Sequence, residues 1–434
     1  MLELITLLLF VAILLIFLFL KLPIAIALLI NLFSFIAYLL KKSFSPQKIL
    51  SMIYDGFKSC ALMLFIFMLI GMITGIWRSC GTISYIIYHA VSFISPKYFY
   101  LGVFLFNSLI SMLTGTSFGT CSTAGVISMS LGLTLGMNPY LTGGAIISGA
   151  FVGDRTSPMS TASLLIATIT ETDFYNNVKN MLKSGLIPFI LTCLTFQLLN
   201  LKAQGSIASP DLSGIKADFS FNIILILPAL LIIVLSLFKV PLKYNMLSSI
   251  ICGIILAYFL QERDFSEIIK SLIFGYKDLN ADKSINGGGI ISMMGAILIV
   301  GISSSYFGIF KESDLLKEVK IFVNKIFDNF PPLITMEILS FFIACFSTNQ
   351  TLSIMLTYEM SRNKVKEKDK LALNLSNSSL LTSVFVPWNI SARIPVDTIG
   401  YPITVIYFSF YQYYIILINS LIDAYDHRRK KLSH

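Results

Sequence analysis

Charged residues, histidines and paired cysteines are scarce in this chain of 434 residues. Only 13% of the residues are charged, and three are histidines. The six cysteines are scattered and form no CxxC pair, so neither a disulfide framework nor a zinc site is expected. We also expect no bound cofactor.

Apolar residues are abundant in this chain. They make up 56% of the chain, whose mean hydropathy is +0.80. They fall in repeated blocks of roughly the 20 residues that a membrane-spanning helix needs. The predicted spans are 2–20, 22–40, 59–77, 98–113, 140–153, 181–200, 221–238, 243–260, 288–310, 333–346 and 401–422. The sequence therefore predicts an all-α polytopic membrane protein with about 10–12 transmembrane helices.

The net charge of +9 comes from basic residues that lie between the apolar blocks. They form no stripe with interleaved aromatic residues, so no nucleic-acid partner is expected. Their three groups are Lys41, Lys42, Lys48 and Lys58; Arg362, Lys364, Lys366, Lys368 and Lys370; and Arg428, Arg429, Lys430 and Lys431. Basic loops stay on the cytoplasmic side of a membrane. We therefore expect both termini to be cytoplasmic and the location to be the bacterial cytoplasmic membrane.

The chain is predicted to be a single membrane transporter domain, residues 1–434, with two similar halves. The halves are 59–200 and 288–422, and a polar stretch at 201–220 links them. Each half contains two apolar runs that are interrupted by polar residues. The interruptions lie at 114–123 and 153–158 in the first half, and at 347–351 and 387–389 in the second.

Interrupted helices at matching positions of two halves predict a transport site. A break frees backbone N–H and C=O groups, which cost several kcal/mol each in hydrocarbon, so it must be buried in protein or line a wet cavity. Such pairs of breaks indicate inverted-topology repeats with discontinuous helices and a site near the membrane midplane. Half-helix ends would direct backbone dipoles at a ligand there. We therefore expect a secondary transporter that works by alternating access.

Asp154 is the strongest candidate for the ion site. A carboxylate at the centre of a membrane helix costs about 2.5–3.5 kcal/mol on insertion scales, so it needs a partner or a function. A proton and a Na⁺ ion would compete for this one group, and that competition is the minimum chemistry of a cation/proton antiporter. The structural alternative is that Asp154 caps a half-helix or pairs with a distant cation.

Polar residues at the four interruptions are the predicted shell around Asp154. They are Thr116, Ser117, Ser157, Thr348, Asn349, Gln350 and Asn389. Their oxygens would replace the waters of a small cation, although Ser and Thr in membrane helices also bond to their own backbone. Ala145, Gly149 and Gly153 form a row of small residues, which predicts close packing of this helix against another.

Two long motifs resemble those of the NhaC-type Na⁺/H⁺ antiporters. GTSFGTCSTAG at 115–125 is similar to that family's GTSWGT signature, and GAFVGDRTSPMS at 149–160 is similar to its G-x-x-x-GD-x-x-SPxS signature. Shorter matches lie at 348–350 and 386–389, and the resemblance covers nearly the whole chain. It implies the ion-transporter fold with inverted repeats, membrane exchange of Na⁺ for H⁺, and Asp154 as the central acid.

The chain departs from this family where acids are expected. Many members have an aspartate where this chain has Thr161, and an acidic pair where it has Ser376 and Asn377. The cation preference and the number of exchanged protons are therefore open.

The remaining charged residues near the motifs allow more than one role. Arg155 follows Asp154, but neighbours on a helix point about 100° apart, so the two need not pair. Arg393 and Asp397 are four residues apart, which favours a helical ion pair; alternatively, Arg393 meets a carboxylate substrate. Glu337 is a second candidate proton carrier, although the neighbouring Pro331-Pro332 favours an interfacial position.

The sequence favours a Na⁺/H⁺ antiporter that exchanges cytoplasmic Na⁺ for external H⁺. Its expected partners are protons, the lipid bilayer and small cations, namely Na⁺ and also Li⁺, and a homo-oligomer is compatible with it. The alternative is a proton- or sodium-coupled exchanger of organic acids, of the malate/lactate type, or of amino acids. A membrane hydrolase using Ser117 is a third hypothesis, because 115–119 matches G-x-S-x-G, but that motif needs a histidine and a strand-turn-helix context. We therefore expect that the protein is not an enzyme.

Overall fold

The computed structural model describes residues 2–20, 22–59, 61–93, 96–202, 219–238, 240–277, 286–313, 330–347 and 349–432. These residues are almost entirely helical, and the only β pairing among them is an isolated bridge between Tyr276 and Gly287. The all-α prediction is thereby confirmed. Most of the predicted linker at 201–220 lies outside the described residues, and its first two residues end a helix.

Every predicted span coincides with one or two helices. The first half of the chain contains α1 (Leu2–Phe19), α2 (Ile24–Lys41), α3 (Pro46–Ser59), α4 (Ala61–Ser79), α5 (Thr82–Phe93), η1 (Pro96–Tyr98), α6 (Phe99–Thr114), α7 (Ser117–Thr120), η2 (Cys121–Gly125), α8 (Val126–Thr134), α9 (Pro139–Thr156), α10 (Thr161–Thr170) and α11 (Phe174–Lys202). The second half contains η3 (Ile223–Ile226), α13 (Leu227–Leu237), α14 (Leu242–Phe259), α15 (Phe265–Phe274), η4 (Ile290–Met293), α16 (Met294–Glu312), α18 (Pro332–Ser347), α19 (Gln350–Ser361), α20 (Lys368–Asn377), α21 (Ser379–Thr382), η6 (Ser383–Phe385), α22 (Ile390–Ile399), η7 (Ile403–Phe408) and α23 (Phe410–Leu432).

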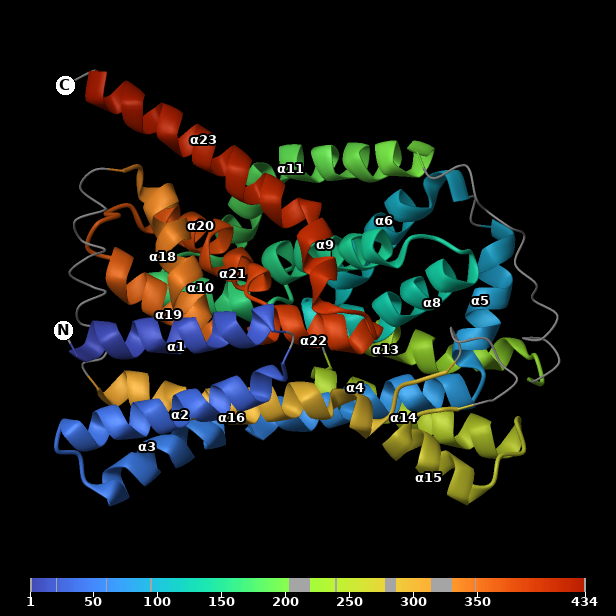
Figure 1. The fold of residues 1–434 in the computed structure, drawn as a ribbon. Coiled ribbons are helices and arrows are strands. Elements are labelled where there is room, and N and C mark those ends of the chain that lie inside the picture. Colours follow the sequence, from blue (N-terminus) through green and yellow to red (C-terminus); the bar gives the residue numbers. More distant parts are fainter. Residues whose placement is uncertain are drawn as a thin grey trace.

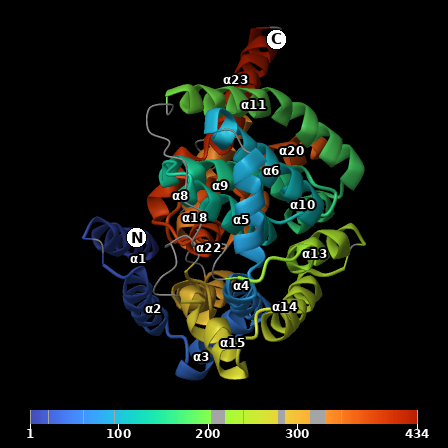
Figure 2. The same ribbon diagram turned by 90° about the vertical axis from the view of Figure 1, so that its right-hand side faces the viewer.

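The helices lie in two layers. Figure 1 shows α2, α3, α4, α14, α15 and α16 along one side and the broken helices along the other, and Figure 2 shows the same division from the end. The start of α1 and the end of α23 lie at one end of the molecule, which we call the terminal end. The pair α18–α19 lies toward the terminal end, and α6 and α8 lie toward the opposite end.

Few of these helices are long enough to cross a membrane alone. In the described part of the chain, α2, α11, α14 and α16 are sufficiently long and apolar, and the pair α4–α5, bent by 64°, would make a fifth crossing. The other apolar segments are shorter, because the predicted interruptions divide them into half-helices. Several helices must therefore combine with a neighbour to cover the membrane thickness.

Helix α9 packs closely against α6 through its small residues. A Cβ atom added to Gly149 would lie 2.6 Å from the carbonyl oxygen of Phe104, and one added to Gly153 would lie 2.1 Å from the carbonyl carbon of Ser111. No real Cβ makes such contacts, so only glycine permits this approach. The predicted packing role of the small-residue row is confirmed at Gly149 and Gly153.

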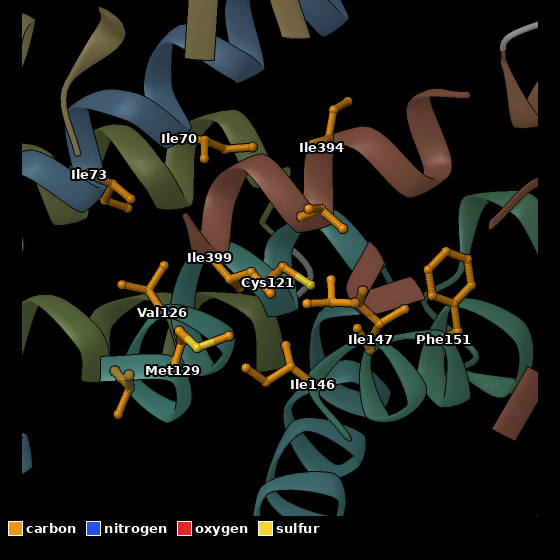
Figure 3. Packing of buried hydrophobic residues seen from close by; sticks show 14 of the residues in the cluster. Ile70, Ile73, Cys121, Val126, Met129, Ile146, Ile147, Phe151, Ile394 and Ile399 are labelled. Carbon is orange, nitrogen blue, oxygen red and sulfur yellow. The ribbon is translucent and has the colours of Figure 1, made fainter. Parts of the chain in front are cut away.

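Apolar side chains surround the region where the helices break. Figure 3 shows Ile70 of α4, Cys121 of η2, Ile147 of α9 and Ile399 of α22 within one buried cluster. These residues come from four elements that are distant in the sequence. Their packing holds the half-helices against the long helix α4 and excludes water around the breaks.

Candidate functional site

Four helix breaks occur at the predicted interruptions. They separate α6 from α7, α9 from α10, α18 from α19, and η6 from α22. At the first break Gly115 has a φ of 68°, a left-handed conformation that glycine adopts without strain. The polar residues at these positions therefore end one helix and begin the next.

Asp154 lies near the end of α9 and joins two of the other breaks. Its side chain is buried, with 5% of the residue exposed. Its Oδ2 atom accepts hydrogen bonds from Ser117 Oγ at 3.1 Å and from Gln350 Nε2 at 3.3 Å. Ser117 is the first residue of α7 and Gln350 is the first residue of α19. One carboxylate oxygen thus connects half-helices from the two halves of the chain.

The fourth break is tied to the same group of helices by side-chain amides. Gln350 Nε2 also donates to the carbonyl oxygen of Leu380 on α21, at 3.0 Å. Asn389, which precedes α22, donates through Nδ2 to the carbonyl oxygen of Ala344 on α18, also at 3.0 Å. A movement of either half-helix would therefore change the surroundings of Asp154.

The electrostatics of the site suit a single small cation or a proton. The N-termini of α7 and α19 carry partial positive charge and face a carboxylate, while the preceding helices α6 and α18 end in carbonyl groups. The described residues contain no group of three His, Cys, Asp or Glu side chains that could hold a metal ion. A cation at Asp154 would therefore take its other ligands from hydroxyl, amide and backbone oxygens.

Arg155 is fully buried and bonds to uncharged groups. Its guanidinium donates to the carbonyl oxygen of Met181 at 2.8 Å, to Ser184 Oγ at 2.6 Å and to Asn377 Oδ1 at 2.6 Å. These contacts lie on α11 and α20, so the side chain binds there and forms no ion pair with a described residue. Arg393, in contrast, forms the favoured helical ion pair, with its Nε atom 2.8 Å from Asp397 Oδ2.

Several predicted shell residues stabilise the breaks and have no direct bond to Asp154 among the described contacts. Thr116 Oγ1 accepts from the backbone N–H of Gly119 at 3.1 Å, and Asn349 Oδ1 accepts from that of Thr351 at 2.9 Å. Ser157 Oγ donates to the carbonyl oxygen of Met112 at 2.7 Å. Thr348 lies outside the described residues.

Two serines outside the predicted shell bond to the backbone around Asp154. Ser160 Oγ donates to the backbone carbonyl of Asp154 and accepts from the N–H of Ser163 at 3.1 Å, so it caps α10. Ser111 Oγ donates to the carbonyl of Ala150 and accepts from the N–H of Gly153 at 2.8 Å. A serine directly before an apolar run is an N-cap signal that would have found Ser160, whereas nothing local marks Ser111.

Broken apolar helices around one buried carboxylate define a multi-pass membrane transporter. The chain belongs to the Na⁺/H⁺ antiporter family, whose family model matches residues 2–179 and 149–423. This family is a class of transporters and not a class of enzymes. The resemblance seen in the sequence motifs is confirmed.

Relatives with assigned names match the chain over most of its length. An uncharacterized Na⁺/H⁺ antiporter of Haemophilus influenzae is 28% identical, over 78% of this chain and 76% of its own. The Na⁺/H⁺ antiporter NhaC of Alkalihalophilus pseudofirmus is 26% identical, over 81% and 79%. A malate-2H⁺/Na⁺-lactate antiporter of Bacillus subtilis is 27% identical, over 82% and 79%.

Proposed function

We propose that the protein is a Na⁺/H⁺ antiporter that exchanges cytoplasmic Na⁺ for external H⁺ by alternating access. The observation that carries the proposal is the buried Asp154 carboxylate, held by Ser117 and Gln350 where half-helices of both halves meet. Membership of the Na⁺/H⁺ antiporter family supports it.

Exchange follows from the competition of two cations for one carboxylate. When the site is open to the cytoplasm, the proton on Asp154 leaves and Na⁺ binds to the carboxylate. Ser117 Oγ, a hydroxyl, can turn its lone pairs toward Na⁺, and Gln350 can present its amide oxygen. When the site is open to the outside, a proton replaces Na⁺. Na⁺ or a proton neutralises the buried charge of Asp154, so the protein can reorient in either filled state. Reorientation with an empty, ionised site would require more free energy, because the charge would stay buried without compensation.

We also propose that the terminal end faces the cytoplasm of a bacterial cell. Basic residues gather at that end, where Lys42 pairs with Glu3 at 2.6 Å and Lys370 pairs with Asp423 at 2.6 Å. Basic loops favour the cytoplasmic side.

The exposed leucines and isoleucines of α1, α11 and α14 would face lipid. The pairs α18–α19 and α6–α8, which lie toward opposite ends, support inverted-topology repeats.

The test is proton movement in inverted membrane vesicles that hold an imposed pH gradient. Addition of Na⁺ should dissipate the gradient through the protein, Li⁺ is expected to act similarly, and K⁺ should have little effect. Asp154→Asn should abolish the response, whereas Asp55→Asn, which removes an exposed acid on α3, should leave it unchanged. A response that survives Asp154→Asn would contradict the proposal.

A second candidate function is exchange of an organic acid. Arg155 favours it, because a buried guanidinium with only uncharged described partners could bind a carboxylate in a bidentate way. The malate-lactate relative adds a precedent. In the same vesicles, dissipation by malate and not by Na⁺ alone would favour this function over Na⁺/H⁺ exchange.

A further inference from the structure

Glu337 is a second buried carboxyl group that the proposed exchange site does not use. It lies in the second turn of α18, and only 9% of the residue is exposed. Its Oε2 atom accepts a hydrogen bond of 2.5 Å from Ser420 Oγ on α23, while its Oε1 atom has no hydrogen-bond partner. The side chain is therefore enclosed between α18 and α23, and the interfacial position expected from Pro331-Pro332 stays a prediction.

Among the residues that the structure describes, the charged groups nearest to Glu337 leave it without a cation of its own. Asp423 on α23 accepts from the backbone N–H of Leu333 at 2.9 Å and binds Lys370 of α20 at 2.6 Å. The Lys370 ammonium therefore compensates Asp423. Several other described charged side chains on the helices around α18 are paired elsewhere, as Glu312 is with Lys48, Glu359 with Arg362, and Lys368 with Glu171. An uncompensated buried carboxylate is costly, and a proton removes that cost.

Polar groups lie between Glu337 and the exchange site. One turn further along α18, Ser340 Oγ donates to the carbonyl oxygen of Glu337 at 3.0 Å and lies 3.0 Å from Thr382 Oγ1 of α21. The same short helix α21 supplies the Leu380 carbonyl that binds Gln350, which in turn donates to Asp154. Elements in contact thus connect the two buried carboxyl groups, and hydroxyls line the route between them.

The position of Glu337 gives this route a direction. Helix α18 starts at Pro332 near the terminal end, so Glu337 lies between that end and the helix breaks. On the helices packed against α18, the paired side chains of Asp423 and Lys370 are 7% and 32% exposed, so this ion pair reaches solvent. A proton leaving Asp154 toward the terminal end would reach Glu337 before it reached solvent.

We propose that Glu337 is the proton-transfer group between Asp154 and the terminal end of the protein. This inference rests on the proposed Na⁺/H⁺ exchange. The proton on Asp154 passes through the hydroxyls and intervening water to the Glu337 carboxylate, where a new O–H bond forms as the old one breaks. Glu337 then releases the proton past Asp423 and Lys370 to solvent, and Na⁺ occupies Asp154. Glu337 holds no Na⁺ in this scheme.

The experiment compares two transport modes of the full chain in proteoliposomes. Net Na⁺/H⁺ exchange needs proton transfer, whereas exchange of labelled Na⁺ for unlabelled Na⁺ needs only Asp154 and reorientation. Glu337→Gln should lower the rate of Na⁺/H⁺ exchange about tenfold or more and leave Na⁺/Na⁺ exchange within about twofold, which also shows that the variant is folded. Glu337→Asp keeps an acid and should recover much of the lost rate. Glu359→Gln, on the neighbouring helix α19, is the matched exposed control.

Two results would overturn the inference. One is normal Na⁺/H⁺ exchange, with an unchanged pH profile, in Glu337→Gln. The other is an equal loss of both transport modes, which would give Glu337 a structural role. If the unmodified chain moves no protons in response to Na⁺, the proposed function itself fails, so the two failures are distinguishable.

Discussion

Among single residues, Arg155 has the buried charge that most needs a physical explanation. A buried guanidinium usually has an acidic partner, yet here it bonds to a carbonyl, a hydroxyl and the Asn377 amide oxygen. In many members of the resembled family an acidic pair stands where this chain has Ser376 and Asn377. Here the described groups around the guanidinium are neutral, and its positive charge directly follows Asp154 in the sequence.

We expect the protein to tolerate Asn377→Asp, whereas an acid introduced at another buried position should destabilise it. The new carboxylate would lie at the position of an oxygen that is 2.6 Å from Arg155 Nη2, and a charge-assisted hydrogen bond contributes about 1.5–3 kcal/mol. Asn374→Asp is the matched control on the same helix, because Asn374 is also buried and no cation of the described residues is bonded to it. The measurement is the thermal unfolding midpoint in detergent. It should stay the same or rise for Asn377→Asp and fall by several degrees for Asn374→Asp, and equal falls would show that Arg155 is already compensated.

The sequence predicted that Asp154, Ser117 and Gln350 belong to one site, and they do lie together, but it did not predict the residues around the arginine. Asp154, Ser117 and Gln350 are all polar residues at helix breaks, so the requirement that a break lines a site pointed to each of them. Asn377 is 222 positions from Arg155 and lies in an ordinary polar stretch. Contacts of this kind depend on how α9 and α20 pack, and no local pattern contains that information.

At the scale of elements, the site depends on how closely α9 can approach α6. Gly153 directly precedes Asp154, and its Cα lies against the backbone of Ser111. Ser111 Oγ also bonds to the N–H of Gly153 and to the carbonyl of Ala150. The two helices therefore hold the exchange carboxylate through backbone contacts that leave no room for a side chain.

We expect Gly153→Ala to destabilise the protein and to disturb the site. Its Cβ would lie 2.1 Å from backbone atoms of α6, so the helices must separate, and overpacking of this kind typically costs about 1–3 kcal/mol. Gly102→Ala on α6 is the control, because a Cβ there meets nothing within 4 Å. Unfolding in detergent should show a lower midpoint for Gly153→Ala and an equal or higher one for Gly102→Ala. Equal midpoints would mean that α6 and α9 are loosely packed.

The sequence predicted which helices exist better than it predicted where they bend. Apolar blocks marked every span, and the polar interruptions marked all four breaks, because both follow from the cost of free backbone groups in lipid. The bend of 64° between α4 and α5, at Cys80 and Gly81, was not predicted. Gly81, with a φ of 83°, permits this bend.

At the scale of the whole molecule, the surface ion pairs should not set the pH dependence of transport. Lys368 and Glu171 join α10 to the start of α20, and their side chains are 60% and 77% exposed. The Lys368 hydrogen bond lowers the pKa of Glu171, so this contribution to stability is present above the ordinary pKa of a glutamate and is lost only as the pH falls further. The pKa of Lys368 is raised by Glu171, so its contribution is lost only at strongly alkaline pH. Across the neutral range the pair is constant, which leaves the buried carboxyl groups to respond to pH.

The orientation of the molecule is open to a direct chemical test. The terminal end bears Asp426, which is exposed on α23, and the opposite end bears Asp264, which is exposed where α14 turns into α15. We expect Asp426→Cys to react with a membrane-impermeant thiol reagent in inverted vesicles, and Asp264→Cys to react in right-side-out vesicles. The unmodified chain is the control for labelling of the native cysteines, of which Cys80, Cys121 and Cys345 are buried and Cys193 and Cys252 are half-buried. The reverse pattern would place the terminal end outside the cell. Glu337 would then lie on the external side of Asp154, so protons would pass it on entry, before they reach the exchange site.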